Sequence, residues 1–208
     1  TLIGKEAMHT SKNGDLSYSR GLIIGMRAGF QHRDPARLVG AQSLDFTNPH
    51  MHFRVIHTTH LSWVLVVVYL DHSIGLVGGN LELVSMLAKL LHHLGLPWLV
   101  VADWNMEPQE LMSLSWYADI GPHVVTPSNV DRTCIKGAQR LLDYALASES
   151  MRLMIQTLEA ELDCPWEPHY GLQLVLQTDP SLVWIRITDS VPKLDVASKR
   201  RSDQDAVF

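Results

Sequence analysis

The chain has few cysteines, no excess of basic residues and no long apolar run. Its two cysteines, Cys134 and Cys164, are not spaced as paired metal ligands and allow at most one disulfide. The formal net charge of −5 excludes a protein that coats nucleic acid through bulk positive charge, so any contact with nucleic acid is local. The longest apolar run, Trp63 to Leu70, is too short to cross a bilayer, which takes about 20 residues.

These absences lead to expectations about location and organisation. No segment has the basic-then-apolar order of a signal peptide, so we expect an intracellular protein, nuclear or cytoplasmic, without a membrane partner. A hydrophobic content of 46% over 208 residues predicts one domain, assigned to residues 1–190, followed by a polar tail at 191–208. We treat the chain as a monomer. Because it begins with Thr1 rather than Met, we expect a fragment or an incomplete gene product.

Apolar segments with strand and helix patterns alternate along the chain, which predicts an α/β fold. The clearest helix places several leucines on one face, with Asn80 as a plausible N-cap and Gly95 at its end. A short helix is expected from Pro108 to Trp116, whereas residues 151–162 fit a helix or a strand. Strands are expected at 21–26, 53–57, 63–70, 98–102, 141–148, 172–177 and 183–187.

The most informative segment is Leu-Val-Val-Ala-Asp-Trp-Asn, residues 99–105. A buried strand that ends in Asp103 and Asn105 puts a carboxylate and a carboxamide at a sheet edge. There the carboxylate can orient a water molecule and the amide can hold a phosphate oxygen. Taken alone, the same residues are more typical of turn formation.

Three further segments follow a recognisable order with this one. They are the apolar strand that ends in Tyr69, the Leu-Asp-Tyr strand around Asp143, and the Pro-His turn at Pro168 and His169. Together the four segments resemble the endonuclease/exonuclease/phosphatase superfamily, and in particular its apurinic endonucleases and retrotransposon endonucleases. The resemblance implies a four-layer sandwich of two packed mixed sheets flanked by helices, with an incomplete amino-terminal part.

The resemblance also implies roles for individual residues. Asp103 would orient or activate the attacking water, and Asn105 would steady the phosphate. Asp143 would hold the catalytic histidine, His169, by a hydrogen bond that fixes its tautomer. His169 would stabilise charge on the phosphate, and the hydroxyl of Tyr69 would contact the phosphate. These five side chains are therefore expected to converge on one cleft, with Asp143 and His169 about 2.6 to 3.2 Å apart.

The implied activity is metal-dependent phosphodiester hydrolysis, with nucleic acid as substrate and Mg²⁺ or Mn²⁺ bound at Asp103. Trp104, inside the turn, is a candidate for stacking on the substrate. Pro168 stands where the superfamily has an aspartate, and its amino-terminal strand with a metal-binding glutamate has no match ahead of Gly21. The alternative is therefore a catalytically inactive domain that binds a partner or a nucleic acid.

A group of four histidines invites a metal-site interpretation. His50 and His52 alternate as they would on one strand face, and His57 and His60 follow. No Cys or Asp nearby completes a set of ligands. The pattern therefore favours a histidine-rich hairpin.

Overall fold

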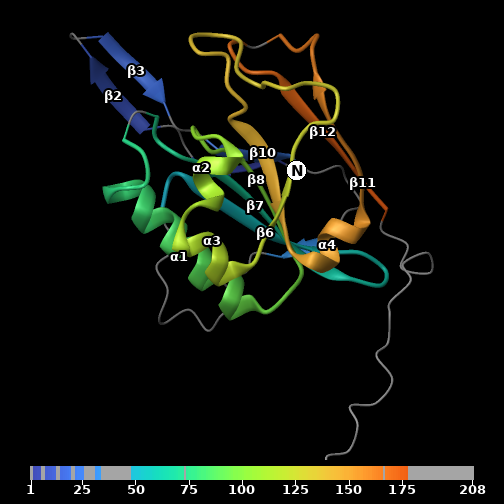
Figure 1. Cartoon of the computed structure of the whole chain (residues 1–208). Coiled ribbons are helices and arrows are strands. Elements are labelled where there is room, and N and C mark those ends of the chain that lie inside the picture. Colours follow the sequence, from blue (N-terminus) through green and yellow to red (C-terminus); the bar gives the residue numbers. More distant parts are fainter. Residues whose placement is uncertain are drawn as a thin grey trace, which may run out of the picture.

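A six-stranded mixed sheet forms the centre of the structure (Figure 1). It is a computed structural model that describes residues 2–5, 8–12, 15–19, 22–25, 31–33, 48–72, 74–165 and 167–177. Neighbouring strands are antiparallel except for the parallel pair of the third and fourth. In spatial order the strands are β5 (Gln31–Arg33), β6 (Met51–His57), β7 (Ser62–Tyr69), β8 (Trp98–Asp103), β10 (Asp143–Ala147) and β9 (His123–Val125).

Strand β7, helix α1 (Gly78–Leu94) and strand β8 form the expected parallel crossover. The helix ends as predicted, because Gly95 adopts a left-handed φ of 58° and its N–H donates to the Leu91 carbonyl at 3.2 Å. Its start differs from the prediction. Val77 is the N-cap, and Asn80 lies inside the first turn, where its side chain bonds the backbone of Asp71 and Gly75. Asn80 therefore closes the loop ahead of the helix.

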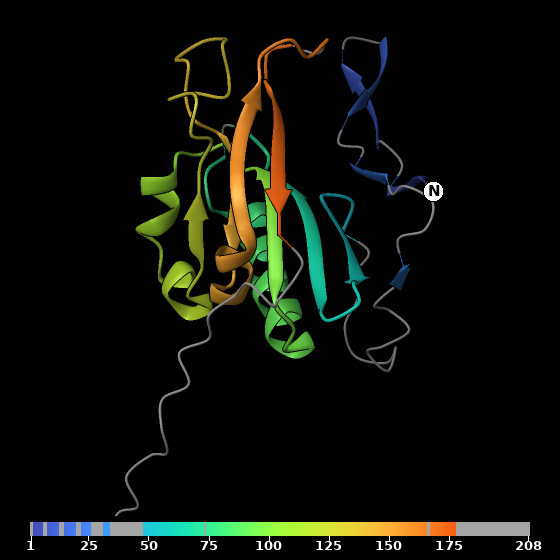
Figure 2. The ribbon, with the colours of Figure 1, turned by 90° about the vertical axis from the view of Figure 1, so that its right-hand side faces the viewer.

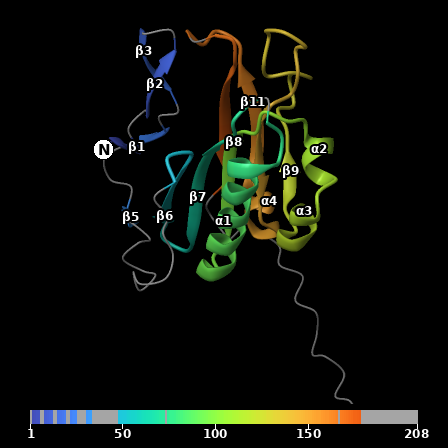
Figure 3. The same cartoon turned by 90° about the vertical axis from the view of Figure 1, so that its left-hand side faces the viewer.

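Helices cover one face of the central sheet (Figure 3). Helix α1 buries a leucine stripe against the sheet, and the helix expected from Pro108 to Trp116 is split into α2 (Pro108–Met112) and α3 (Ser115–Ile120). The N–H of Ser113 bonds the Gln109 carbonyl at 3.2 Å, which closes α2. Trp116 nevertheless reaches the same core, where its indole N–H donates to the Val84 carbonyl at 2.6 Å.

A second, two-stranded sheet covers the opposite face (Figure 2). It consists of β11 (Ile155–Glu161) and β12 (Gly171–Leu176), and helix α4 (Glu149–Met154) leads into β11. The ambiguous segment 151–162 thus contains a helix and a strand in succession. Leu158 of β11 packs with Leu99 and Ala145 of the central sheet in a second hydrophobic cluster. The chain is an α/β protein in which helices, a mixed sheet and a second sheet form successive layers.

The described amino-terminal segments form two small antiparallel pairs. Strand β1 (Leu2–Lys5) pairs with β4 (Leu22–Gly25), where the sequence predicts a strand, and β2 (Met8–Lys12) pairs with β3 (Asp15–Ser19). The strand expected at 183–187 and the polar tail at 191–208 lie outside the described residues. Within the described ranges, no helix combines the length and the apolar character needed to span a membrane.

Candidate functional site

Three polar side chains lie in one row across the central sheet, at the level where three neighbouring strands begin or end. Tyr69 and Asp103 are cross-strand partners at the ends of β7 and β8, and Asp103 faces Asp143 at the start of β10. Because cross-strand partners project on the same face, all three side chains project on one side. Asp103 shares its face with Val101, which packs toward the second sheet. The row therefore lies at one end of the interface between the two sheets.

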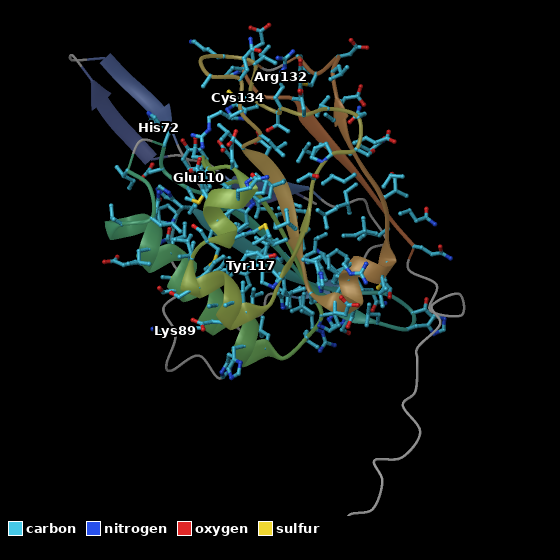
Figure 4. All side chains as sticks on the ribbon, viewed as in Figure 1. His72, Lys89, Glu110, Tyr117, Arg132 and Cys134 are labelled. Atoms are coloured by element: carbon cyan, nitrogen blue, oxygen red, sulfur yellow. The ribbon has the colours of Figure 1, made fainter. Side chains whose placement is uncertain are left out.

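His169 joins this row from the turn that precedes β12. Its Nδ1 lies 2.7 Å from Oδ2 of Asp143, which confirms the predicted contact between residues 26 positions apart. His169 also forms an isolated antiparallel bridge with Cys134. Figure 4 labels Cys134 and Arg132 on the loop at this end of the molecule.

Thr133 holds both sides of the contact between Asp143 and His169, and the sequence reasoning missed it. Its buried hydroxyl accepts the backbone N–H groups of Asp143 at 2.8 Å and Leu142 at 3.0 Å. Its carbonyl accepts the N–H of Tyr170, next to the histidine, at 2.9 Å. A threonine in an irregular loop carries no periodic signal, so only the folded backbone identifies this role.

The Asp103 carboxyl is poised to accept a proton near neutral pH. Burial and the negative charge of Asp143 raise the pKa of Asp103 from 3.8 to about 6, while His169 and the N–H of Asn105 oppose the change. Above that pH the carboxylate is ionised and can take a proton from a water molecule. A base whose pKa lies close to the operating pH is an efficient general base.

His169 is biased toward its charged form. Its hydrogen bond to Asp143 raises the pKa of the imidazole above 6.5, and the charges of Asp143 and Asp103 act in the same direction against burial. With Asp143 accepting the Nδ1 proton, Nε2 can donate a proton or a hydrogen bond. The surroundings of the two groups therefore suit Asp103 to the role of base and His169 to the role of acid.

Asn105 braces the turn after β8. It adopts a left-handed φ of 50°, which asparagine tolerates better than most residues, and its N–H donates to Asp103 Oδ1 at 3.1 Å. Its side-chain Nδ2 donates to the Leu70 carbonyl at 2.6 Å, which ties the ends of β7 and β8 together. One of the two Nδ2 hydrogens is thus engaged within the protein. Phosphate binding by Asn105 stays a prediction.

Trp104 lies in the hydrophobic core and offers no exposed surface for stacking on a substrate, which corrects the expectation from the sequence. Its side chain has 0% exposure, and its Nε1 donates to the Tyr144 carbonyl at 3.1 Å. Its ring stacks on Tyr144, with centroids 5.7 Å apart, and tilts against Trp116. The reason is strand alternation: Asp103 faces the second sheet, so the next residue turns toward the helices.

The acidic side chains and His169 also form a candidate metal centre. Ligand atoms of Asp103, Asp143 and His169 all lie within 4.8 Å of one another. Two adjacent carboxylates with one imidazole leave an excess of negative charge, so the donor set suits a divalent cation. Pro168 contributes a carbonyl that accepts the N–H of Ile135 at 2.9 Å, and Glu167 is exposed.

Comparison of the sequence with protein-family models and with curated proteins finds no match. Comparison of the structure with solved structures does find matches. The endonuclease domain of TRAS1, a telomere-specific non-LTR retrotransposon, superposes with a TM-score of 0.61 at 13% identity over 85% of this chain and 80% of that one. The 3′ phosphatase NExo from Neisseria, bound to a product DNA hairpin, gives 0.49 at 12% identity over 85% and 79%. The chain shares the fold of the TRAS1 endonuclease domain.

Proposed function

We propose that this chain is a metal-dependent phosphodiesterase that cleaves nucleic acid. The observation that carries the proposal is the 2.7 Å contact between His169 Nδ1 and Asp143 Oδ2, with Asp103 directly across the strand pair. A structural ion pair would not need a second carboxylate in the same row. An oriented imidazole beside a carboxylate of raised pKa is the arrangement that acid–base chemistry requires.

In the proposed reaction, Asp103 accepts a proton from the attacking water, whose oxygen bonds to phosphorus. The P–O bond to the leaving sugar oxygen breaks, and that oxygen takes a proton from solvent. His169, held by Asp143, donates a hydrogen bond through Nε2 to the phosphate and stabilises the charge that develops there. Tyr69 and Asn105, on either side of Asp103, contact the phosphate oxygens. Each role assigns a chemical task to a side chain at the same sheet edge.

A divalent cation, Mg²⁺ or Mn²⁺, would be held by Asp103, with Asp143 next to it. When bound, such a cation neutralises charge on the phosphate. The aspartates are hard oxygen ligands, which Mg²⁺ prefers in proteins. The chain's own residues supply the water-orienting and phosphate-stabilising groups on either side.

Positively charged side chains on the loop between β9 and β10 support the proposal that the substrate is an anionic polymer. It is hydrogen-bonded to the His169 turn through the N–H of Ile135 and the carbonyl of Pro168 at 2.9 Å. Arg132 and Lys136 of this loop are exposed, whereas Arg140 forms ion pairs with Glu107 and Glu110 of the α2 region. Local positive charge beside the site can contact phosphates although the chain is acidic overall.

The test is a cleavage assay on plasmid DNA, abasic duplex and a phosphomonoester, with Mg²⁺ or Mn²⁺. Asp103→Asn should abolish cleavage, and Asp131→Asn, an exposed acid on the loop, should retain it. Equal rates for wild type and Asp103→Asn on every substrate would refute the proposed function.

The second candidate is an inactive domain that only binds a partner or nucleic acid. It is favoured by Pro168, which offers a carbonyl where the superfamily that this chain resembles has a carboxylate. Calorimetric titration with Mn²⁺ separates the two candidates. Saturable binding that Asp103→Asn removes supports the enzyme, whereas nucleic-acid binding without Mn²⁺ binding supports the inactive domain.

A further inference from the structure

A fourth polar side chain extends the row of Tyr69, Asp103 and Asp143. His50, just ahead of β6, accepts the Tyr69 N–H on its carbonyl at 3.0 Å, which makes it the cross-strand neighbour of Tyr69. The two rings are in contact, with centroids 5.8 Å apart and planes tilted by 55°. His50 therefore projects on the same face as the candidate catalytic residues.

The His50 ring is oriented by its backbone contacts. Its Nδ1 lies 3.2 Å from the Tyr69 carbonyl, and because a carbonyl only accepts, Nδ1 is the donor. The His50 backbone N–H donates to Asn48 Oδ1 at 2.8 Å, which fixes the start of the strand. Among the described residues no hydrogen bond uses Nε2, on the far side of the ring. A protonated His50 would present an N–H donor there.

The width of the row indicates how long a substrate it can contact. Neighbouring strands lie about 4.8 Å apart, so the row from His50 to Asp143 spans roughly 14 Å. That distance exceeds the size of one phosphate group. The next row inward contains His52 on β6, followed by Val67, Val101 and Ala145, so on β7, β8 and β10 the polar character is concentrated at the strand ends. A substrate with phosphates at regular intervals along a chain would use the whole row.

We propose that His50, beside Tyr69, forms a flanking subsite that binds the phosphate next to the one that is cleaved. The inference rests on the proposed function, and it specifies a nucleic-acid strand with consecutive phosphates rather than a small phosphate ester. The protonated imidazole of His50 donates through Nε2 to the flanking phosphate, while its Nδ1–H stays on the Tyr69 carbonyl.

The test measures binding of a fluorescein-labelled thymidine oligonucleotide to the full chain in EDTA by anisotropy, over a range of salt concentrations. His50→Ala should weaken binding about tenfold, because a hydrogen bond to a charged group is lost. It should also reduce the slope of log affinity against log salt by about 0.7, the value for one phosphate contact on a single strand. His50→Arg should restore both quantities. His60→Ala, an exposed histidine in the turn of the same hairpin, is the matched control.

Cleavage assays run in parallel separate the two claims. If nothing is cleaved but His50→Ala alone weakens binding and lowers the salt slope, the flanking subsite stands and the proposed function fails. If DNA is cleaved but His50→Ala binds like His60→Ala, the subsite is refuted and the proposed function stands. Absence of oligonucleotide binding by the wild-type chain would also overturn the subsite.

Discussion

Asp103 and Asp143 face each other as direct partners across β8 and β10, and the imidazole of His169 hydrogen-bonds Asp143, with ligand atoms of all three side chains within 4.8 Å of one another. The two carboxyl groups differ in their electrostatic surroundings. Asp143 accepts a hydrogen bond from His169, whereas the pKa of Asp103 rises to about 6. Two chemically identical groups thus acquire different properties from their surroundings.

Asp103 and His169 should both titrate above their ordinary pKa values in the metal-free protein. The Asp103 carboxyl should lose its proton near pH 6 and the His169 imidazole at a pH above 6.5, since the pKa of each group is raised. Asp143→Asn removes the negative charge that raises both pKa values, so both titrations should move to lower pH. NMR titration of the metal-free wild type and of Asp143→Asn measures the shift, and titration curves that are unchanged in Asp143→Asn would contradict the assigned couplings.

Asp103→Asn should stabilise the metal-free protein above pH 6. The folded-state pKa of about 6 lies above the unfolded value near 3.8, so the ionised carboxylate is disfavoured by folding at higher pH. The substitution should raise the free energy of unfolding by about 1 to 2 kcal/mol after allowance for partial exposure. Urea denaturation should show this gain shrinking as the pH falls from 6 to 4. A gain that does not depend on pH would argue against burial of a charged group.

Thr133→Val should lower the stability of the protein by removing the hydroxyl that supports the start of β10. The substitution leaves the buried N–H groups of Leu142 and Asp143 without their acceptor, which should cost about 2 to 4 kcal/mol of unfolding free energy. Thr133→Ser keeps the hydroxyl and should retain most of the stability and activity. Chemical denaturation and cleavage rates measured on both variants check this, and equal behaviour of the two would rule out the hydrogen-bonding role.

Trp104→Ala should act on stability and not selectively on substrate binding. The ring is fully buried against Tyr144 and Trp116, so truncation should cost about 3 to 5 kcal/mol. In protein that remains folded, affinity for an oligonucleotide should match wild type. A stable variant with much weaker oligonucleotide binding would restore Trp104 as a substrate contact.

Periodicity predicted the scaffold of the site well. Uniformly apolar runs identified β7 and β8, and Gly95 marked the end of α1, because burial and left-handed backbone geometry restrict residue choice locally. The start of α1 was misplaced, since Asn80 bonds the loop backbone rather than capping the helix. A side chain's local preference cannot reveal which of several nearby backbone groups it will meet.

The site itself was only partly predictable. The ordered motifs indicated Asp103, Asp143 and His169, and the contact between the last two follows the expectation. The orientation of Trp104 and the position of His50 beside Tyr69 depend on strand register, which pairs residues far apart in sequence. Register is a property of the assembled sheet, so it could not be derived from local spacing.

The central claim is that Asp143 and His169 act together on a phosphodiester. Single-turnover cleavage of an oligonucleotide with Mn²⁺ tests it most directly, with Asp143→Asn, His169→Gln and the double variant compared with wild type. Each single substitution should lower the rate constant by about 10² to 10⁴, and the double variant should be little slower than the slower single one, because the pair works as a unit. Wild-type rates in both single variants, or no cleavage by any form of the protein, would contradict the account.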